Sequence, residues 1–236
     1  MKRQIVKLAS SEEPIFFISD IHSNFPALKA VLASIPAKAS VFCAGDILGY
    51  YTEPNEVSAL LIDRGVTCIK GNHDKYVLEE LSYSDSRESK YRIKDTRTAL
   101  TLANTEWLRS LPDVLDICFG DCASIVRMVH GTERSVEEYI YPDTPITFEL
   151  DPGVVVLVAG HTHHPMLRQI GPARMLNPGS VGQARDRIPG ACYASVNIAS
   201  GVVDFYRVQY SIQEYQQRLL AAGVQPAMVD MLSRQS

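Results

Sequence analysis

The 236-residue chain has few of the sequence features that mark exported, membrane-bound or thiol-ligated proteins. It contains five cysteines, an odd number at irregular spacing without a CxxC pair, which disfavours a disulfide framework, a zinc ribbon and a thioredoxin-like motif. Cys43 and Cys68 lie in apolar stretches, which favours buried free thiols and a reducing compartment. The longest aliphatic run, residues 154–159, is far shorter than the ~20 residues of a membrane span. Because residues 1–13 also lack the apolar core of a secretory signal, we expect a cytoplasmic protein without membrane contact.

The chain also has little excess charge. Its formal net charge is -4, whereas a protein that coats nucleic acid is usually basic, so nucleic acid is disfavoured as a partner. Hydrophobic residues make up 46% and charged residues 21%, as in an ordinary globular protein that buries its own core. We therefore predict a single domain over residues 1–236.

Strand and helix signals alternate in the first third of the chain. Short apolar runs at residues 15–18, 41–44 and 66–69 have the length of strands, and residues 26–34 and 54–64 have helical spacing of apolar positions. Repeats of this kind predict parallel strands joined by right-handed crossovers.

The remaining segments are of two kinds. Residues 75–112 are polar and mostly helical, and we interpret them as an insertion over the sheet, either a plain surface hairpin of helices or a cover for substrate. The last half is strand-rich and ends in a helix at residues 211–222. The predicted strands there are residues 114–119, 125–129, 154–159, 166–170, 191–198 and 202–208.

Each of the six histidines follows an apolar, strand-like run. In open α/β sheets, ligand sites collect at the carboxyl ends of strands, so these histidines and the acidic or amide residues beside them are candidate ligands. The motifs are, in order, Asp20-Ile21-His22, Gly45-Asp46, Gly71-Asn72-His73-Asp74, His130-Gly131 and Gly160-His161-Thr162-His163.

The candidate ligands are too many for a single ion. Seven side chains qualify, and two ions that share a bridging carboxylate can use them all. Oxygen and imidazole ligands without thiolate suit Mn²⁺ best here, with Fe, Zn²⁺ and Ni²⁺ as alternatives.

The order of these motifs resembles the signature of the calcineurin-like metallophosphoesterases. The turn at residues 177–182 and the segments at residues 45–50 and 53–57 are similar to the small bacterial and archaeal branch. The resemblance implies an α/β fold, a two-sheet β-sandwich flanked by helices. Residues 48–50, Leu-Gly-Tyr, replace the GDxVDRG extension of Ser/Thr phosphatases, which puts the arginine contacts of that class in doubt.

The resemblance also implies how the ligands divide between the metals. Asp20, His22 and His163 would hold the first ion. Asn72, His130 and His161 would hold the second, and Asp46 would bridge the two. His73 would lie just outside the metal shell.

We therefore predict hydrolysis of phosphomonoesters or phosphodiesters by a hydroxide that bridges two metal ions. His73 is the candidate general acid for the leaving oxygen, or else a residue that orients Asn72 or Asp46. Lys70 and Arg185 are candidates for contact with substrate phosphate.

The substrate class stays open between small phosphoesters, nucleotides and phosphoproteins. Dinucleoside polyphosphate hydrolysis and a non-catalytic scaffold of the same fold are the alternatives. A nuclease is a further class, which the acidic balance disfavours.

Overall fold

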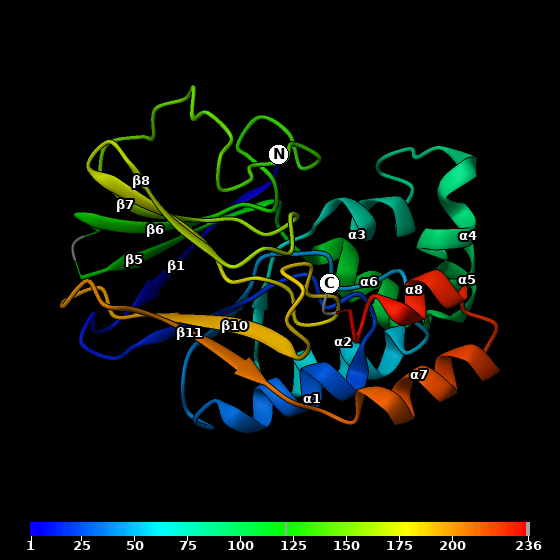
Figure 1. Ribbon diagram of the computed structural model, residues 1–236. Coiled ribbons are helices and arrows are strands. Elements are labelled where there is room, and N and C mark those ends of the chain that lie inside the picture. Colours follow the sequence, from blue (N-terminus) through cyan, green and yellow to red (C-terminus); the bar gives the residue numbers. More distant parts are fainter. Residues whose placement is uncertain (121, 235–236) are drawn as a thin grey trace.

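Two β-sheets lie face to face at the centre of the computed structural model, which describes residues 1–120 and 122–234 (Figure 1). The five-stranded sheet contains, in spatial order, β11 (Val203–Val208), β10 (Ala191–Val196), β2 (Ile15–Ile18), β3 (Val41–Cys43) and β4 (Thr67–Cys68). The six-stranded sheet contains β1 (Arg3–Leu8), β5 (Val114–Phe119), β6 (Ser124–Met128), β7 (Val154–Val158), β9 (Ala173–Asn177) and β8 (Met166–Ile170). The predicted fold class, an α/β sandwich of two sheets flanked by helices, is confirmed.

The parallel strands in both sheets determine where functional side chains can gather. β2, β3 and β4 are mutually parallel, and so are β6, β7 and β9. In the five-stranded sheet the crossovers are α1 (Phe25–Ser34) and α2 (Pro54–Asp63). The Asn24 side chain accepts a hydrogen bond from the Ala27 amide, and Pro26 pre-sets the first turn, so α1 begins directly after the loop that follows β2.

The hydrophobic core fills the space between the sheets and continues on their outer faces. Phe17 and Phe42 stack at 5.8 Å between ring centroids and pack against side chains such as Val126 and Val156 of the other sheet. α1 packs on β10 and β11 of the five-stranded sheet. The outer face of the six-stranded sheet is covered by the segment 131–150, which buries Ile140 there.

The predicted insertion is helical, but part of it belongs to the core. It contains the end of α3 (Asn72–Val77), a 3₁₀ turn (Asp85–Arg87), α4 (Glu88–Tyr91), α5 (Ile93–Ala99) and α6 (Leu102–Ser110). Tyr76, Tyr91, Ile93 and Leu108 are buried in the same cluster as α1 and α2. Residues 75–112 thus lie over the sheet with part of their apolar side chains in the core, while others, such as Leu102, stay exposed.

Three elements were not predicted. β1, with the sequence RQIVKL, is mostly exposed at the edge of its sheet and pairs in parallel with β5. β9 is a short strand that completes a hairpin with β8, and α8 (Pro226–Asp230) follows α7 (Ile212–Ala221). Their local patterns are weak, and long-range pairing decides them. Cys43 and Cys68 are buried free thiols, as expected. Within the described residues, no helix combines the length and apolar character needed to cross a bilayer.

Candidate metal centre

The predicted ligands converge on one edge of the sandwich, although they come from five separate strand ends. Asp20 and His22 follow β2, and Asp46 follows β3. His130 follows β6, while His161 and His163 follow β7. Asn72 begins α3 after β4. All seven side chains are buried, because parallel strands of both sheets end at this edge.

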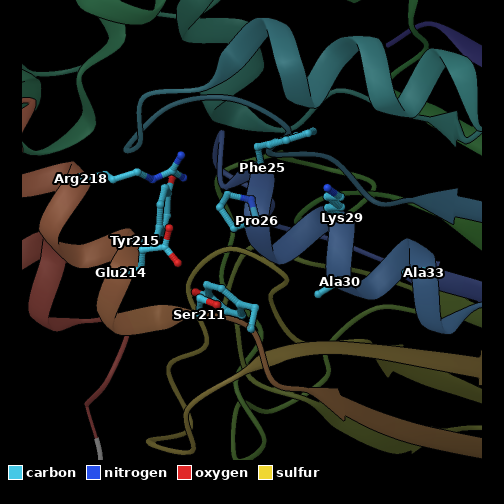
Figure 2. Close-up of a pocket in the computed structure, with 10 residues that line it drawn as sticks. Phe25, Pro26, Lys29, Ala30, Ala33, Ser211, Glu214, Tyr215 and Arg218 are labelled. Carbon is cyan, nitrogen blue, oxygen red and sulfur yellow. The ribbon is translucent and has the colours of Figure 1, made fainter.

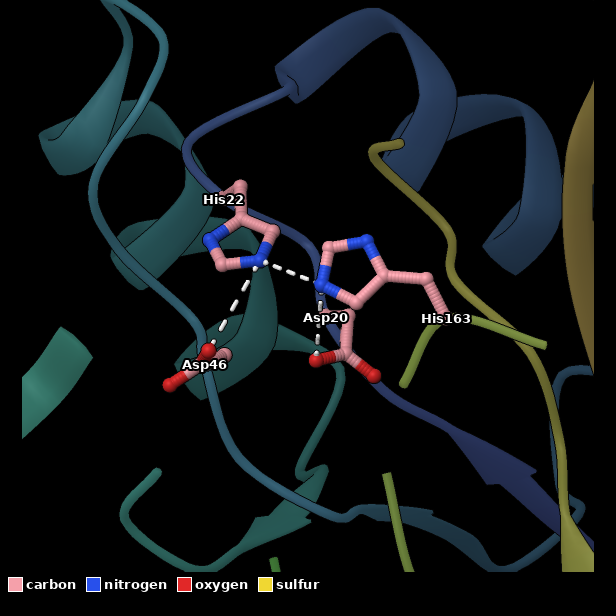
Figure 3. A group of neighbouring side chains, drawn as sticks. All are labelled: Asp20, His22, Asp46 and His163. Carbon is pink, nitrogen blue, oxygen red and sulfur yellow. Dashed lines mark hydrogen bonds and ion pairs between the residues drawn. The ribbon is translucent and has the colours of Figure 1, made fainter. Parts of the chain in front are cut away.

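The ligand atoms form two groups that share Asp46. In the first group, atoms of Asp20, His22, Asp46 and His163 lie within 4.8 Å of one another, and their side chains point toward a common centre (Figure 3). In the second group, atoms of Asp46, His130 and His161 do the same. Asn72 joins the second group, because its Oδ1 lies 3.1 Å from His130 Nε2.

Two imidazoles face each other in a way that requires a positive charge between them. His22 Nδ1 lies 3.2 Å from the Leu48 carbonyl and His163 Nδ1 lies 2.7 Å from the Gln183 carbonyl, so both Nδ1 atoms donate. Burial lowers the pKa of both histidines well below the ordinary value, so their rings are neutral. The two unprotonated Nε2 atoms are only 3.1 Å apart, a repulsive contact of lone pairs that a bound cation converts into ligation.

The electrostatics of both groups also favour positive charge. Burial raises the pKa of Asp20 to about 7, which shows how costly a desolvated carboxylate is at this position. Burial lowers the pKa of His130, but Asp46 and Asp20 outweigh burial and raise that pKa to about 9. Aspartate oxygens, an amide oxygen and imidazole nitrogens are a donor set for divalent transition metals, so the residues fit the metal that the motifs imply.

Backbone strain is concentrated at these ligands. Five of the seven adopt positive φ without being glycine: Asp20, His22, Asp46, His161 and His163. Non-glycine residues in the left-handed region cost of order 1–3 kcal/mol each and persist where the surroundings over-determine them. Here the surroundings include close backbone approaches. A Cβ on Gly71 would lie 2.1 Å from Asp46 Oδ1, and a Cβ on Gly160 would lie 2.8 Å from Asp20 Oδ2.

Asp74 holds two of the ligand loops together, a role that sequence reasoning missed. Its carboxylate accepts hydrogen bonds from the amides of Ile47, Leu48 and Gly71, at 3.2, 3.1 and 2.8 Å. The loop after β3, which carries Asp46, is thereby tied to the loop after β4, which carries Asn72. The signal was present in the Gly-Asn-His-Asp motif, where the acid stands at the third position of the helix and can cap it.

His73 lies beside the ligand groups without belonging to them. Its ring centroid is 4.9 Å from that of His22, and its amide donates to Asp46 Oδ1 at 2.8 Å. Tyr50 and Tyr91 pack against the ring at 4.8 and 4.4 Å. Burial lowers the pKa of His73 to about 4. The position agrees with the expectation that His73 lies outside the metal shell.

The two candidate phosphate contacts have different surroundings. The Lys70 ammonium lies 2.7 Å from Glu80 Oε2 and 3.9 Å from Asp113 Oδ1, so its charge is neutralised within the protein and the structure gives it no contact with the ligand groups. Arg185 donates to the Tyr50 hydroxyl at 3.3 Å and to Gln183 Oε1 at 3.1 Å. No carboxylate pairs with Arg185 within the described part of the chain, and it is close enough to influence the ionisation of Asp20 and His163.

A hollow of about 460 Å³ lies between α1 and α7 (Figure 2). Phe25 and Pro26 of α1 line one side, and Glu214 and Arg218 of α7 line the other. Arg218 is paired with Glu53 at 2.9 Å. None of the seven predicted ligands lines this hollow, so the candidate chemistry belongs to the sheet edge.

Comparison with known proteins agrees with the geometry. Residues 14–201 match the model of the calcineurin-like phosphoesterase superfamily domain. An uncharacterised protein of Methanocaldococcus jannaschii is 31% identical over 225 residues, which is 87% of this chain and 91% of the relative. The crystal structure of a metallophosphoesterase from Sphaerobacter thermophilus is similar at a TM-score of 0.76 and 28% identity, over 94% of this chain and 99% of that one.

The fold is shared more widely than the sequence. A hypothetical protein of Pyrococcus horikoshii is 21% identical and superimposes with a TM-score of 0.80, over 94% of this chain and 98% of that one. The family match extends over most of the chain and includes every loop that carries a candidate ligand. The chain therefore belongs to the calcineurin-like phosphoesterase superfamily, a family of metal-dependent hydrolases that act on phosphoester bonds.

Proposed function

We propose that this protein hydrolyses small phosphoesters, phosphomonoesters or phosphodiesters, with two divalent metal ions bound at the sheet edge. The observation that carries the proposal is the pair of neutral imidazoles, His22 and His163, whose acceptor nitrogens face each other at 3.1 Å beside two buried carboxylates. The two overlapping groups of ligand atoms support two ions, with Asp46 between them. Mn²⁺ is the favoured ion for this donor set, and Fe, Zn²⁺ and Ni²⁺ are the alternatives.

Bound divalent ions would supply Lewis acidity, which lowers the pKa of water and offsets the charge of phosphate oxygens. The protein's own residues then bind and orient the substrate. Arg185 has guanidinium donors on the same side of the molecule as the first ligand group, and a guanidinium recognises phosphate oxygens in a bidentate manner. Tyr50 and Gln183 hold this side chain in position.

His73 is the proposed general acid. Its ring packs beside His22 and is held by Tyr50 and Tyr91, so it is positioned next to a phosphoester bound at the ligand groups. An anionic phosphoester bound beside the ring would raise the pKa of His73 from the value of about 4 that burial sets, and the protonated imidazole would pass its proton to the leaving oxygen as the bond from oxygen to phosphorus breaks. Hydrogen bonding of the His73 amide to Asp46 fixes the backbone from which the ring extends.

The proposed substrate is a small phosphoester or nucleotide in the cytoplasm, with phosphoproteins as a further class. The net charge of -4 argues against a nucleic acid partner. Dinucleoside polyphosphate hydrolysis remains an alternative within the same chemistry. A non-catalytic scaffold is disfavoured, because no predicted ligand position has lost its donor and all seven side chains are buried at one edge.

The test is reconstitution of metal-free protein with single ions. We expect hydrolysis of p-nitrophenyl phosphate or bis-p-nitrophenyl phosphate to return with Mn²⁺, and the preferred ester separates a phosphatase from a phosphodiesterase. Metal content measured by elemental analysis should approach two ions per chain. Stoichiometric metal binding without hydrolysis of either ester, or of a panel of nucleotides, would favour the scaffold.

A further inference from the structure

The segment 131–150 places two tyrosines, Tyr139 and Tyr141, beside the candidate metal centre. Tyr139 stacks on the ring of His161, with 3.9 Å between centroids. Tyr141 stacks on Tyr139 at 5.7 Å with an interplanar angle of 3°, and its ring meets His164 edge-on at 6.0 Å. Tyr139 and Tyr141, called the tyrosine pair below, thus extend from a metal ligand toward solvent.

The backbone of this segment explains why both rings point the same way. Residues two apart in an extended chain share a side, and the residue between them, Ile140, is buried against the six-stranded sheet. Arg168 donates to the carbonyls of Tyr141 and Thr144 at 2.9 and 2.7 Å. The tyrosine pair is therefore presented by an anchored segment rather than by a loose loop.

Both rings of the pair remain partly exposed although they are stacked. Tyr139 is 41% exposed and Tyr141 is 39% exposed, and within residues 1–120 and 122–234 neither hydroxyl has a hydrogen-bond partner. Aromatic surface left in water is unfavourable unless something covers it. The exposed faces of the two rings lie next to the site where a phosphoester would bind. The organic group of that phosphoester would therefore cover them.

The charge nearby fits such a ligand. The Arg185 amide donates to the carbonyl of His163, a candidate ligand of the first group, at 3.3 Å, and its guanidinium donates to the Tyr50 hydroxyl beside His22 at 3.3 Å. The cation is thereby held at the metal centre. A single ligand with a phosphate group at the metal centre and a planar ring against the tyrosines would use all three features.

We propose that the tyrosine pair is a stacking platform for the organic part of the substrate, and that the preferred substrates are phosphoesters of a planar aromatic group, either an aryl group or a nucleobase. This inference rests on the proposed function. Tyr141, the outer ring of the pair, would meet the planar group of the substrate, and Tyr139 would support Tyr141 from the side of His161. Stacking of a planar ring on an aromatic side chain is tolerant of ring identity, which suits a platform without hydrogen-bonding partners.

The experiment compares ligands that differ only in the planar ring. Calorimetry on Mn²⁺-loaded protein measures the affinity for phenylphosphonate and for ethylphosphonate, neither of which has a phosphoester bond to hydrolyse. A second arm compares the KM of adenosine 5′-monophosphate with that of ribose 5-phosphate. We expect the aromatic member of at least one pair to be favoured by about 10-fold. A preference in the first arm alone indicates an aryl group, and a preference in the second alone indicates a nucleobase.

Variants of the outer tyrosine identify the cause of that preference. Tyr141→Leu should reduce the preference to about 1-fold and leave the affinity for ethylphosphonate unchanged, whereas Tyr141→Phe should keep it, because stacking needs the ring and not the hydroxyl. Phe205→Leu on β11, where the side chain is 43% exposed, is the matched control and should change nothing. An aromatic preference that survives Tyr141→Leu, or no preference in either arm, would overturn the platform while leaving the proposed hydrolase intact. If the metal-loaded protein neither binds the phosphonates nor hydrolyses any ester, both proposals fail together.

Discussion

The ion pairs around the buried Arg127 and the groups at the candidate metal centre balance their charges in opposite ways. On the six-stranded sheet, Arg127 donates to both oxygens of Asp116 at 2.8 and 3.0 Å and to Glu133 and Asp151 at 2.6 Å each. That cluster supplies its own cation. At the sheet edge, by contrast, Asp20 and Asp46 meet imidazole nitrogens, and the facing atoms of His22 and His163 are both acceptors.

The comparison separates a structural cluster from a functional one. Buried charges are tolerated where each is paired and hydrogen-bonded, as around Arg127. Facing acceptor nitrogens, such as those of His22 and His163, are stabilised by a cation from outside the chain. Burial of charge therefore does not identify the site, but these facing acceptors do. The expected effects below test this distinction, from the largest to the smallest.

Asp46→Asn should have the largest effect, because Asp46 belongs to both ligand groups. We expect turnover to fall by about 10³-fold or more and metal content to drop. Asp116→Asn is the matched control in the other cluster, and it should lower stability while each folded molecule keeps its metal. Equal loss of metal in the two variants would contradict the distinction between the clusters.

Arg127→Met should destabilise the fold by about 3 kcal/mol, because it leaves the buried Asp116 carboxylate without its main partner. Urea denaturation of metal-free protein measures this change. The double variant Arg127→Met with Asp116→Leu should recover much of the loss, since an apolar pair needs no counter-charge. Metal content should stay at the wild-type level in both variants, and a drop would show that the two clusters are coupled.

His73→Asn tests a residue that contacts the metal cluster without belonging to it. We expect turnover to fall by about 10²-fold, the lower range for loss of a general acid. The metal content and the thermal midpoint of the metal-loaded protein should not change. Loss of metal in this variant would instead assign His73 the role of orienting Asn72 or Asp46.

Removal of metal by a chelator should lower the stability of the wild-type protein. At about 30 times the dissociation constant, a ligand that binds only the folded state contributes about 2 kcal/mol. For a chain of this size, that corresponds to a shift of roughly 4–8 °C in the thermal midpoint. Asp116→Asn should show the same shift on metal addition, whereas Asp46→Asn should show little of it.

Much of the site was predictable because its ligands occupy short motifs after strands. Strand-to-turn signals such as Gly45-Asp46 and Gly160-His161 are local, and glycine at these positions permits the close approaches that the structure shows. The role of Asp74 was also within reach, from its position at the start of α3. The pairing of Lys70 was not predictable, because Glu80, its partner, lies ten residues away in the polar insertion and gives no signal of pairing.

Other features depend on contacts between segments that are distant in the chain. The tyrosine pair comes from a segment without a motif, and its position beside His161 exists only once β6 and β7 are paired. β1 becomes a strand because β5 offers it an edge. The burial of residues 75–112 depends on how Tyr91 and Leu108 pack against α1 and α2.

By itself, the sequence determined the family, the fold class and the seven candidate ligands, because these depend on local motifs and on the order of strands and helices. Only the tertiary structure decided how those ligands face one another, which cations have internal partners and which aromatic rings stay uncovered. The physical reason is that charge balance and burial are properties of neighbours in space. His22 and His163 are 141 residues apart, yet their opposed nitrogens are the strongest sign of a metal in the molecule.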